Sequence, residues 1–380
     1  MDLMRRYPAH DDLRRRAMRR VPGLAWDFFI GGIGPELGLK QNRAALDAIR
    51  LAPRYIQEPF VPDMAVELMG RRYAMPFGVC PMGLTSLIWP RSEFALAAAA
   101  KAADIPYGLS SFASATLEEI AALAGPNAWY QHYVTNRPEI EADLLNRAKA
   151  AGYETLVVTV DVPGETKRDR DIKNGLSMPP KFDLRTVAQV AACPRWAWET
   201  WRAGIPQLAI LGRYVPKGAS MEERGAFMDA VMEGNVGPER LRQIRDAWTG
   251  KMVVKGVLDP ADAEECRRIG VDGIVVSNHG GRQLDPAPAP VEVLGAIRDA
   301  AGPGIAIIAD SGVTSGADIA RALAAGADFV LLGRAFLMGV AALGAPGAAH
   351  VVDILRTELR STMGQIGAKT VAEMPEFLAR

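Results

Sequence analysis

Residues 251–285 read KMVVKGVLDPADAEECRRIGVDGIVVSNHGGRQLD. Two short runs rich in Val and Ile, 251–256 and 273–278, flank an amphipathic stretch that opens with Asp259 and Pro260. Asp is a preferred N-cap residue, and Pro is tolerated in the first turn of a helix. A strand, a helix and a second strand within 30 to 35 residues are typical of a parallel βαβ unit.

The same alternation extends in both directions from this stretch. Short apolar runs alternate with Ala-rich amphipathic stretches, several of which open with Ser, Thr, Asp or Pro. The expected strands cover 77–82, 107–111, 128–134, 155–161, 251–256, 273–278, 305–310 and 329–333, and the expected helices begin near Ser92, Thr116, Pro138, Pro238, Asp259, Pro290, Ser315 and after Arg334. Eight such units predict an α/β fold, the (β/α)8 TIM barrel.

The ends of the eight runs support a barrel over an open sheet. Each run terminates in polar or Gly-rich residues, and closing a barrel brings these ends into one ring. A doubly wound sheet gathers such residues at one switch point and carries a GxGxxG turn after an early strand. No such turn is present.

The spacing of the runs shows one long insertion. Successive runs start 21 to 32 residues apart, except for a gap of 96 residues between Thr155 and Lys251. We therefore expect a helical segment at 1–76 that packs on the barrel, a catalytic barrel at 77–380, and an insertion at about 162–237 on the catalytic face. Trp196, Trp198 and Trp201 of the insertion either pack within a lid or contact a membrane or partner.

Composition excludes several classes of protein. The 44 basic and 44 acidic residues of the 380 balance, which disfavours nucleic-acid binding. Three cysteines lie far apart, without a CxxC pair or a His at zinc-ligand spacing, so we expect reduced thiols, a cytoplasmic location and no metal site. The first 20 residues hold seven Arg and no apolar run, and therefore do not resemble a secretory signal.

The segment after the sixth run carries the most chemistry. His279 follows this run, and the two glycines after it allow a ligand to approach the backbone closely. Histidine suits proton abstraction near neutral pH, and the planar guanidinium of Arg282 suits a carboxylate. The alternative is a histidine with a structural role only.

Two further ionisable residues end strands. Lys255 is either a Schiff-base lysine or a cation that stabilises negative charge developing on a cofactor. Asp161 either orients His279 or caps the following loop. Asp310, Ser311, Gly312, Gly333 and Arg334 precede the last two helices, where barrels commonly bind phosphate, and they imply a phosphate-bearing cofactor.

In these motifs the chain resembles the family of FMN-dependent α-hydroxy-acid oxidases and dehydrogenases, which includes glycolate oxidase, mandelate dehydrogenase and L-lactate dehydrogenase. The resemblance covers 21–374 and rests on the SNHGGRQLD segment at 277–285, together with Thr159-Val160-Asp161, Asp171-Ile172-Lys173-Asn174, Val254-Lys255-Gly256 and Leu332-Gly333-Arg334. Trp196-Ala197-Trp198 and 306–312 are most similar to the flavin-dependent bacterial L-lactate dehydrogenases.

The resemblance implies a role for each site residue. His279 would be the base, held by Asp161, and Arg282, Arg168 and Tyr133 would contact the substrate. Lys255 would stabilise the reduced flavin. The remaining residues would surround FMN: Pro81, Met82, Gly83, Ser110, Gln131, Thr159 and Ser277 around the ring system, and Asp310, Ser311, Gly312, Gly333 and Arg334 around the ribityl phosphate.

The implied activity is FMN-dependent oxidation of an L-2-hydroxy acid, such as a lactate- or mandelate-like compound, to the 2-oxo acid. Electrons would pass to oxygen, a quinone or a cytochrome. Both a hydride and a carbanion path remain open. We further expect a homotetramer, with contact to the inner face of the cell membrane as an open alternative to a purely cytoplasmic protein.

Three positions depart from the family pattern. Phe28 stands where the family has a Tyr that binds the substrate carboxylate, Phe112 where glycolate oxidase has Trp, and Thr314 where the family has a phosphate-binding Arg. These changes leave two alternatives: an FMN enzyme for a larger or peptide-derived hydroxy acid, and a flavin-binding protein without catalysis.

Overall fold

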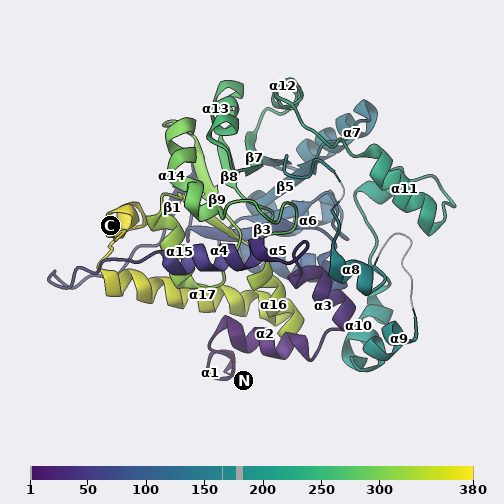
Figure 1. Ribbon diagram of the computed structural model, residues 1–380, viewed down its shortest axis with the longest axis horizontal. Coiled ribbons are helices and arrows are strands. Elements are labelled where there is room, and N and C mark those ends of the chain that lie inside the picture. The colour runs from purple at the N-terminus through teal and green to yellow at the C-terminus, as the bar shows by residue number, and fades with distance from the viewer. Residues whose placement is uncertain (1, 165, 177–182, 380) are drawn as a thin grey trace.

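Eight parallel strands form a closed barrel at the centre of the protein, as predicted (Figure 1). In this computed structural model the described residues are 2–164, 166–176 and 183–379. Around the barrel the order is β10, β3, β4, β5, β6, β7, β8 and β9. The bounds are β3 (Phe77–Met82), β4 (Tyr107–Ser110), β5 (Ala128–Tyr133), β6 (Thr155–Thr159), β7 (Lys251–Val257), β8 (Gly273–Val276), β9 (Ala306–Ala309) and β10 (Phe329–Leu332).

Helices follow the strands and surround the barrel, and the eight expected helix starts are confirmed to within a residue or two. Thr116 and Ser315 form capping boxes, and Asp259 accepts a hydrogen bond from the first turn of its helix. The helices are α5 (Ser92–Ala102), α6 (Leu117–Ala124), α7 (Pro138–Ala150), α12 (Pro238–Ala247), α13 (Pro260–Ile269), α14 (Pro290–Ala301), α15 (Gly316–Ala324) and α16 (Arg334–Leu343), followed by α17 (Ala345–Ile366) and the 3₁₀ helix η4 (Val371–Phe377).

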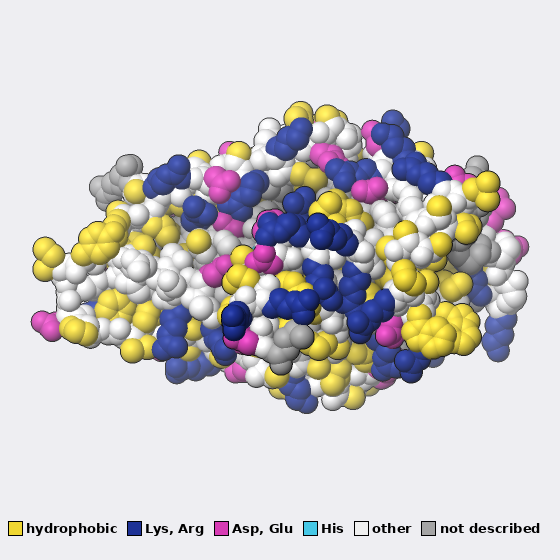
Figure 2. All heavy atoms as spheres, turned by 90° about the horizontal axis from the view of Figure 1, so that it is seen from below, with side chains coloured by type: hydrophobic (Ala, Val, Ile, Leu, Met, Phe, Trp, Pro, Cys, Tyr) yellow, Lys and Arg dark blue, Asp and Glu magenta, His cyan; other side chains and the backbone are white. Residues whose placement is uncertain are grey.

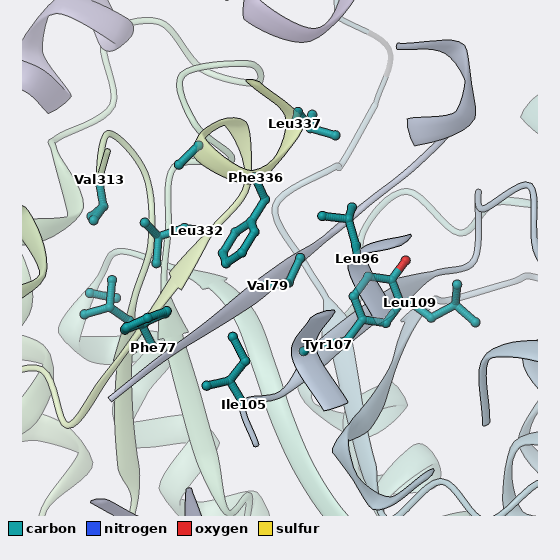
Figure 3. Packing of buried hydrophobic residues seen from close by; sticks show 14 of the residues in the cluster. Phe77, Val79, Leu96, Ile105, Tyr107, Leu109, Val313, Leu332, Phe336 and Leu337 are labelled. Carbon is teal, nitrogen blue, oxygen red and sulfur yellow. The ribbon is translucent and has the colours of Figure 1, made fainter. Parts of the chain in front are cut away.

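Alternation along each strand divides the core into two layers. Residues of one phase pack outward against the helices; Figure 3 shows Phe77, Val79 and Tyr107 packed with Leu96 of α5 and Phe336 of α16. Residues of the other phase fill the barrel interior: Cys80, Trp129, Val157, Val253, Val275, Ile308, Phe329 and Leu331. The side chains that point inward continue to alternate along each strand up to its carboxyl end. At that end they reach the site.

The N-terminal segment contains helices, as expected, and a small sheet that was not predicted. Its helices are α1 (Leu3–Arg6), α2 (His10–Met18), α3 (Gly23–Ile30) and α4 (Leu37–Ala48). The hairpin β1 (Val66–Leu68) and β2 (Arg71–Tyr73) packs on the interior layer, where Trp129 Nε1 donates to the Tyr73 hydroxyl at 3.2 Å. A hairpin of three-residue strands is too short for its period to stand out in the sequence.

The insertion after β6 consists of short helices: α8 (Asp169–Lys173), α9 (Leu184–Ala191), α10 (Pro194–Ala203), the 3₁₀ helix η3 (Leu211–Tyr214) and α11 (Met221–Val231). One of its three tryptophans packs within the protein, and the other two are available for contact with a membrane or partner. Trp196 is buried and donates to the carbonyl oxygens of Leu87 and Ile88, whereas Trp198 and Trp201 are exposed and stack with ring centroids 5.1 Å apart. No helix in the described part of the chain is long and apolar enough to cross a bilayer.

Candidate active site

A cavity of about 390 Å³ opens at the carboxyl ends of the strands. Most of the predicted site residues line it: Phe28, Pro81, Met82, Gly83, Ser110, Gln131, Tyr133, Arg168, Lys255, His279, Arg282, Asp310, Ser311, Gly312, Gly333 and Arg334. Three do not: Asp161, Thr159 and Ser277. Each of these instead hydrogen-bonds a residue that does line the cavity. These three residues therefore lie next to the cavity, where they hold lining residues in place and do not form its surface.

The inward phase of the strands explains which side chains reach the cavity. Gln131 and Tyr133 follow the interior Trp129 by two and four residues, and Lys255 follows Val253 by two. Cys80, two residues before Met82, shares this phase and also lines the cavity, although it was not among the predicted residues. The alternation in β3 was the signal that could have identified it.

His279 is fixed in place by two contacts. Its Nδ1 lies 3.0 Å from Oδ1 of Asp161, and its backbone N–H donates to Ser277 Oγ at 3.0 Å. Its φ of 55°, with 65° at Gly280 and 72° at Gly281, places three successive residues in the left-handed region. A non-glycine residue held in this region is unusual and is common at functional sites.

Asp161 is ionised in this arrangement. Burial alone would raise the pKa of its carboxyl group, but the contact with His279, the charge of Lys255 and hydrogen bonds outweigh burial and lower it. Its Oδ2 is buried without a hydrogen-bond partner. A charged Asp161 therefore accepts the Nδ1–H of His279, which leaves Nε2 free to accept a proton.

Lys255 lies on the floor of the cavity as a paired cation. Nζ is 3.1 Å from Oδ2 of Asp310 and donates to Ser277 Oγ at 2.9 Å. Burial would lower the pKa of this ammonium group, but the carboxylates of Asp310 and Asp161 raise it above its ordinary value. A charged lysine is a poor Schiff-base nucleophile, so the geometry favours the role of a stabilising cation.

Three guanidinium groups give the cavity an excess of positive charge. Burial, and then the charges of Arg168 and Arg334, lower the pKa of Arg282. Burial likewise lowers the pKa of Arg334. Nε of Arg168 is buried without a hydrogen-bond partner. An anionic ligand would satisfy this donor and reduce the repulsion.

The end of the cavity that was predicted to bind phosphate has the features of an anion site. The backbone of Ser311 and Gly312 is left-handed, with φ of 73° and 84°. The first turn of α16 begins beside Gly333 without a side-chain cap, and Arg334 lies at its start. Thr314 does not replace the missing arginine directly, because its N–H and hydroxyl donate to Asp318. These residues fit FMN, with the phosphate held by the helix N-terminus and Arg334.

The opposite end of the cavity is largely apolar. Phe112 and Tyr133 pack edge to face with ring centroids 4.9 Å apart, and Phe28 lies under Arg282, whose Cζ is 5.4 Å from the ring centroid. Leu84 and Val162 complete this wall. The wall is suited to an apolar substituent on a small anion.

A (β/α)8 barrel with a histidine paired to a carboxylate, a buried lysine and an uncapped helix start beside Arg334 has the features of an oxidoreductase that binds a phosphate-bearing cofactor. Residues 17–380 match the model of the family described as FMN-dependent dehydrogenase. The chain belongs to this family and is an FMN-dependent flavoprotein.

Individual relatives match along nearly the whole chain. The (S)-mandelate dehydrogenase of Pseudomonas putida is 37% identical over 97% of this chain and 93% of its own length. An L-lactate dehydrogenase of Ectopseudomonas mendocina is 39% identical over 97% of this chain and 98% of its own length. These values do not separate the two kinds of relative.

Solved structures agree in fold. The crystal structure described as the monotopic membrane protein (S)-mandelate dehydrogenase superimposes with a TM-score of 0.93, at 36% identity and over 100% of both chains. A mandelate oxidase has a TM-score of 0.83 at 34% identity, over 97% of both chains.

Proposed function

We propose that this protein oxidises an L-2-hydroxy acid to the 2-oxo acid. The observation that carries the proposal is that His279, paired with Asp161, lines the same cavity as Arg282 and Arg168. The names of the relatives, which include mandelate and L-lactate dehydrogenases, support the same class of substrate.

His279 acts as the base. Nε2 takes a proton from the hydroxyl group or the α-carbon of the substrate, and Asp161 stabilises the imidazolium that forms. FMN, when bound, accepts the two electrons that the substrate loses. The fixed charge of Lys255 stabilises negative charge that develops at the floor of the cavity.

Arg282 and Arg168 bind the substrate carboxylate. Both line the cavity, and the excess of positive charge there favours an anion. Tyr133 lies within the same lining and supplies a hydroxyl group for the substrate oxygen. Burial raises the pKa of this phenol, which keeps it protonated as a donor.

The direct test is anaerobic mixing of the FMN-loaded protein with 2-hydroxy acids while the flavin absorbance is recorded. We expect bleaching with at least one L-isomer and none with its D-isomer. A protein that binds FMN but shows no bleaching with a panel from glycolate to aryl and long-chain 2-hydroxy acids would be the non-catalytic alternative.

A second candidate is an enzyme for a larger 2-hydroxy acid. Phe28 and Phe112 make the substrate end more apolar than a site for glycolate or lactate requires. An aryl or long-chain substituent would bury these rings, at a gain of about 25 cal/mol per Å² of apolar surface removed from water. The same panel of substrates separates the two candidates through kcat/KM.

We infer a peripheral membrane location on the cytoplasmic face, with a membrane quinone as one acceptor and oxygen or a cytochrome as alternatives. The exposed stack of Trp198 and Trp201 supports it, as does the monotopic membrane mandelate dehydrogenase among the relatives. In Figure 1, α2, α9 and α10 lie along the lower edge, and Figure 2 shows that face with Lys and Arg side chains in its middle and hydrophobic side chains where α9 and α10 lie.

We further propose that the barrel at 77–380 and the segment at 1–76 act as one catalytic unit, and that four copies assemble. Tyr55, Ile56 and Val61 are largely exposed, on a segment that extends from the body of the protein (Figure 1). Contact with another copy would remove this apolar surface from water.

A further inference from the structure

One turn of backbone at the end of α3 orients two arginines of the cavity. Nη1 of Arg282 donates to the carbonyl oxygens of Phe28 and Gly31 at 2.6 and 2.9 Å. Nε and Nη2 of Arg334 donate to the carbonyl oxygens of Phe29 and Gly31 at 2.9 and 3.2 Å. Nη1 of Arg334 also donates to the carbonyl oxygen of Gly280 at 2.8 Å. The turn at 28–31, which lies outside the barrel, thus supplies both contacts of Arg282 and two of the three contacts of Arg334.

Arg170 of the insertion holds this turn from the other side. Its Nη1 is 3.2 Å from Oδ1 of Asp27, directly before the turn, and its Nη2 is 2.5 Å from Oε2 of Glu36, after it. Glu36 also accepts the Gly32 N–H at 3.1 Å. One guanidinium group thus joins both flanks of the turn.

The contacts around Arg170 leave little room for the turn to move. A Cβ atom at Gly31 would lie 3.2 Å from Cδ of Arg170 and 2.7 Å from the carbonyl oxygen of Asp27. Asn174 of the insertion donates to Oδ2 of Asp27 at 2.8 Å. Burial would raise the pKa of Glu36. The hydrogen bonds from Arg170 and the Gly32 N–H, together with the charges of Arg170 and Arg334, outweigh burial and lower this pKa.

We propose that Arg170 is a positioning residue. By joining Asp27 to Glu36 it fixes the 28–31 turn, and the carbonyl oxygens of that turn orient Arg282 toward the substrate carboxylate and Arg334 toward the FMN phosphate. The part that concerns the substrate rests on the proposed function; the part that concerns FMN does not.

The ion pair between Arg170 and Glu36 has a second effect, on Arg334. The carboxylate of Glu36 is the leading opposing charge in the surroundings of Arg334, whose own pKa is lowered by burial. Arg334 already donates to the carbonyl oxygens of Phe29, Gly280 and Gly31, and each of its two Nη atoms keeps one further N–H for a phosphate while Arg170 occupies Glu36. Without Arg170, the carboxylate of Glu36 competes with the phosphate for Arg334.

The test compares Arg170→Met with Lys173→Met, a control on the same short helix at an exposed position for which the described residues show no ion pair. The readouts are the Kd of FMN, from fluorescence quenching as FMN is added to the deflavinated protein, and KM and kcat for L-lactate and (S)-mandelate. We expect Arg170→Met to raise the Kd of FMN and the KM about tenfold or more, with a smaller change in kcat. Lys173→Met should change neither, and Arg170→Lys should lie between.

Two further variants keep the proposal testable if Arg170→Met does not fold. Glu36→Gln should raise the Kd of FMN by a smaller factor, because it weakens the clamp without leaving a competing carboxylate. Arg170→Met combined with Glu36→Gln should bind FMN more tightly than Arg170→Met alone. A folded Arg170→Met, or Glu36→Gln in its place, with Kd and KM both within about twofold of the parent protein overturns the proposal. If no hydroxy acid is oxidised, the proposed function fails and the Kd of FMN alone decides the role of Arg170.

Discussion

At the scale of single residues, His279 combines a left-handed backbone with a carboxylate partner at 3.0 Å. We predict that His279→Gln abolishes flavin reduction by substrate, with a loss of roughly 10²–10⁴-fold or more in rate, and that FMN stays bound. The substitution removes the base without changing the anion site around Arg334. Stopped-flow absorbance measures the rate, and the flavin content of the purified variant is the control. Reduction at the rate of the parent protein would exclude His279 as the base.

Phe28, like Phe112, lines the cavity at a position expected to depart from the family pattern. If the pocket binds a small carboxylate, Phe28→Tyr adds one charge-assisted hydrogen bond, worth about 1.5–3 kcal/mol, and lactate-like substrates gain roughly tenfold or more in apparent affinity. If the native substrate places an apolar group against Phe28, the new hydroxyl is left unpaired at a cost of about 1–3 kcal/mol.

The measurement is KM across a series from glycolate and lactate to aryl and long-chain 2-hydroxy acids. We expect small substrates to improve and the native one to worsen if it is large. No change at any member of the series would mean that Phe28 does not face the substrate, in spite of its place in the cavity lining.

At the scale of elements, Asp318 joins α15, α4 and the turn that leads to the anion site. Arg43 of α4 donates to both of its oxygens at 2.8 Å, and the Thr314 N–H donates at 3.0 Å. Burial would raise the pKa of this carboxyl group, but these hydrogen bonds lower it to about 2. Asp318 thus connects α4 to the turn at Thr314 beside the anion site.

A pKa below the unfolded value means that the charged form stabilises the fold. This stability is fully present above about pH 4 and is lost as the pH falls toward 2. We predict that Asp318→Asn lowers the free energy of unfolding by roughly 2 kcal/mol at pH 7 and by about half as much at pH 3. Urea denaturation at both pH values measures it, and Asp353→Asn, in an exposed pair with Arg356, is the control. An equal loss at both pH values would show that the charge of Asp318 is not the cause.

At the scale of the whole molecule, the proposed membrane location is tested on the surface that carries α10. We predict that Trp198→Ser with Trp201→Ser reduces sedimentation with anionic phospholipid vesicles about tenfold or more, since each exposed ring contributes roughly 1.5–3 kcal/mol on burial. Leu378→Ser, which removes an exposed apolar side chain on another segment, is the control. Unchanged sedimentation with the tryptophans removed would refute membrane contact through α10, and FMN should stay bound in every variant.

The exposed segment at 55–61 carries the prediction on assembly. We predict that the protein sediments at four times the mass of one chain, and that Tyr55→Ser with Ile56→Ser lowers this value, because these side chains are exposed in the single chain. Analytical ultracentrifugation measures the mass. A tetramer unaffected by the change would place the contact elsewhere, and a monomeric parent protein would contradict the tetramer itself.

The sequence by itself determined the barrel, the order of its strands and most of the cavity lining. Period-two alternation is a local property, and in a closed parallel barrel it determines which side chains point inward. Lys255 could therefore be assigned to the cavity from its strand alone, whereas Gln131 was assigned through the resemblance to the family. The motif at 277–285 likewise supplied His279 and Arg282.

Only the tertiary structure decided which surfaces outside the barrel meet. The turn at 28–31 reaches Arg282 from more than 250 residues away, and Arg170 reaches Asp27 across 143 residues. In α10 the spacing of Trp198 and Trp201 puts them on one face, but only the packing of Trp196 against Leu87 and Ile88 shows which face is buried. Helical periodicity fixes which side chains lie together, whereas the choice of the buried face depends on the shape of the neighbouring surface, which a local pattern does not encode.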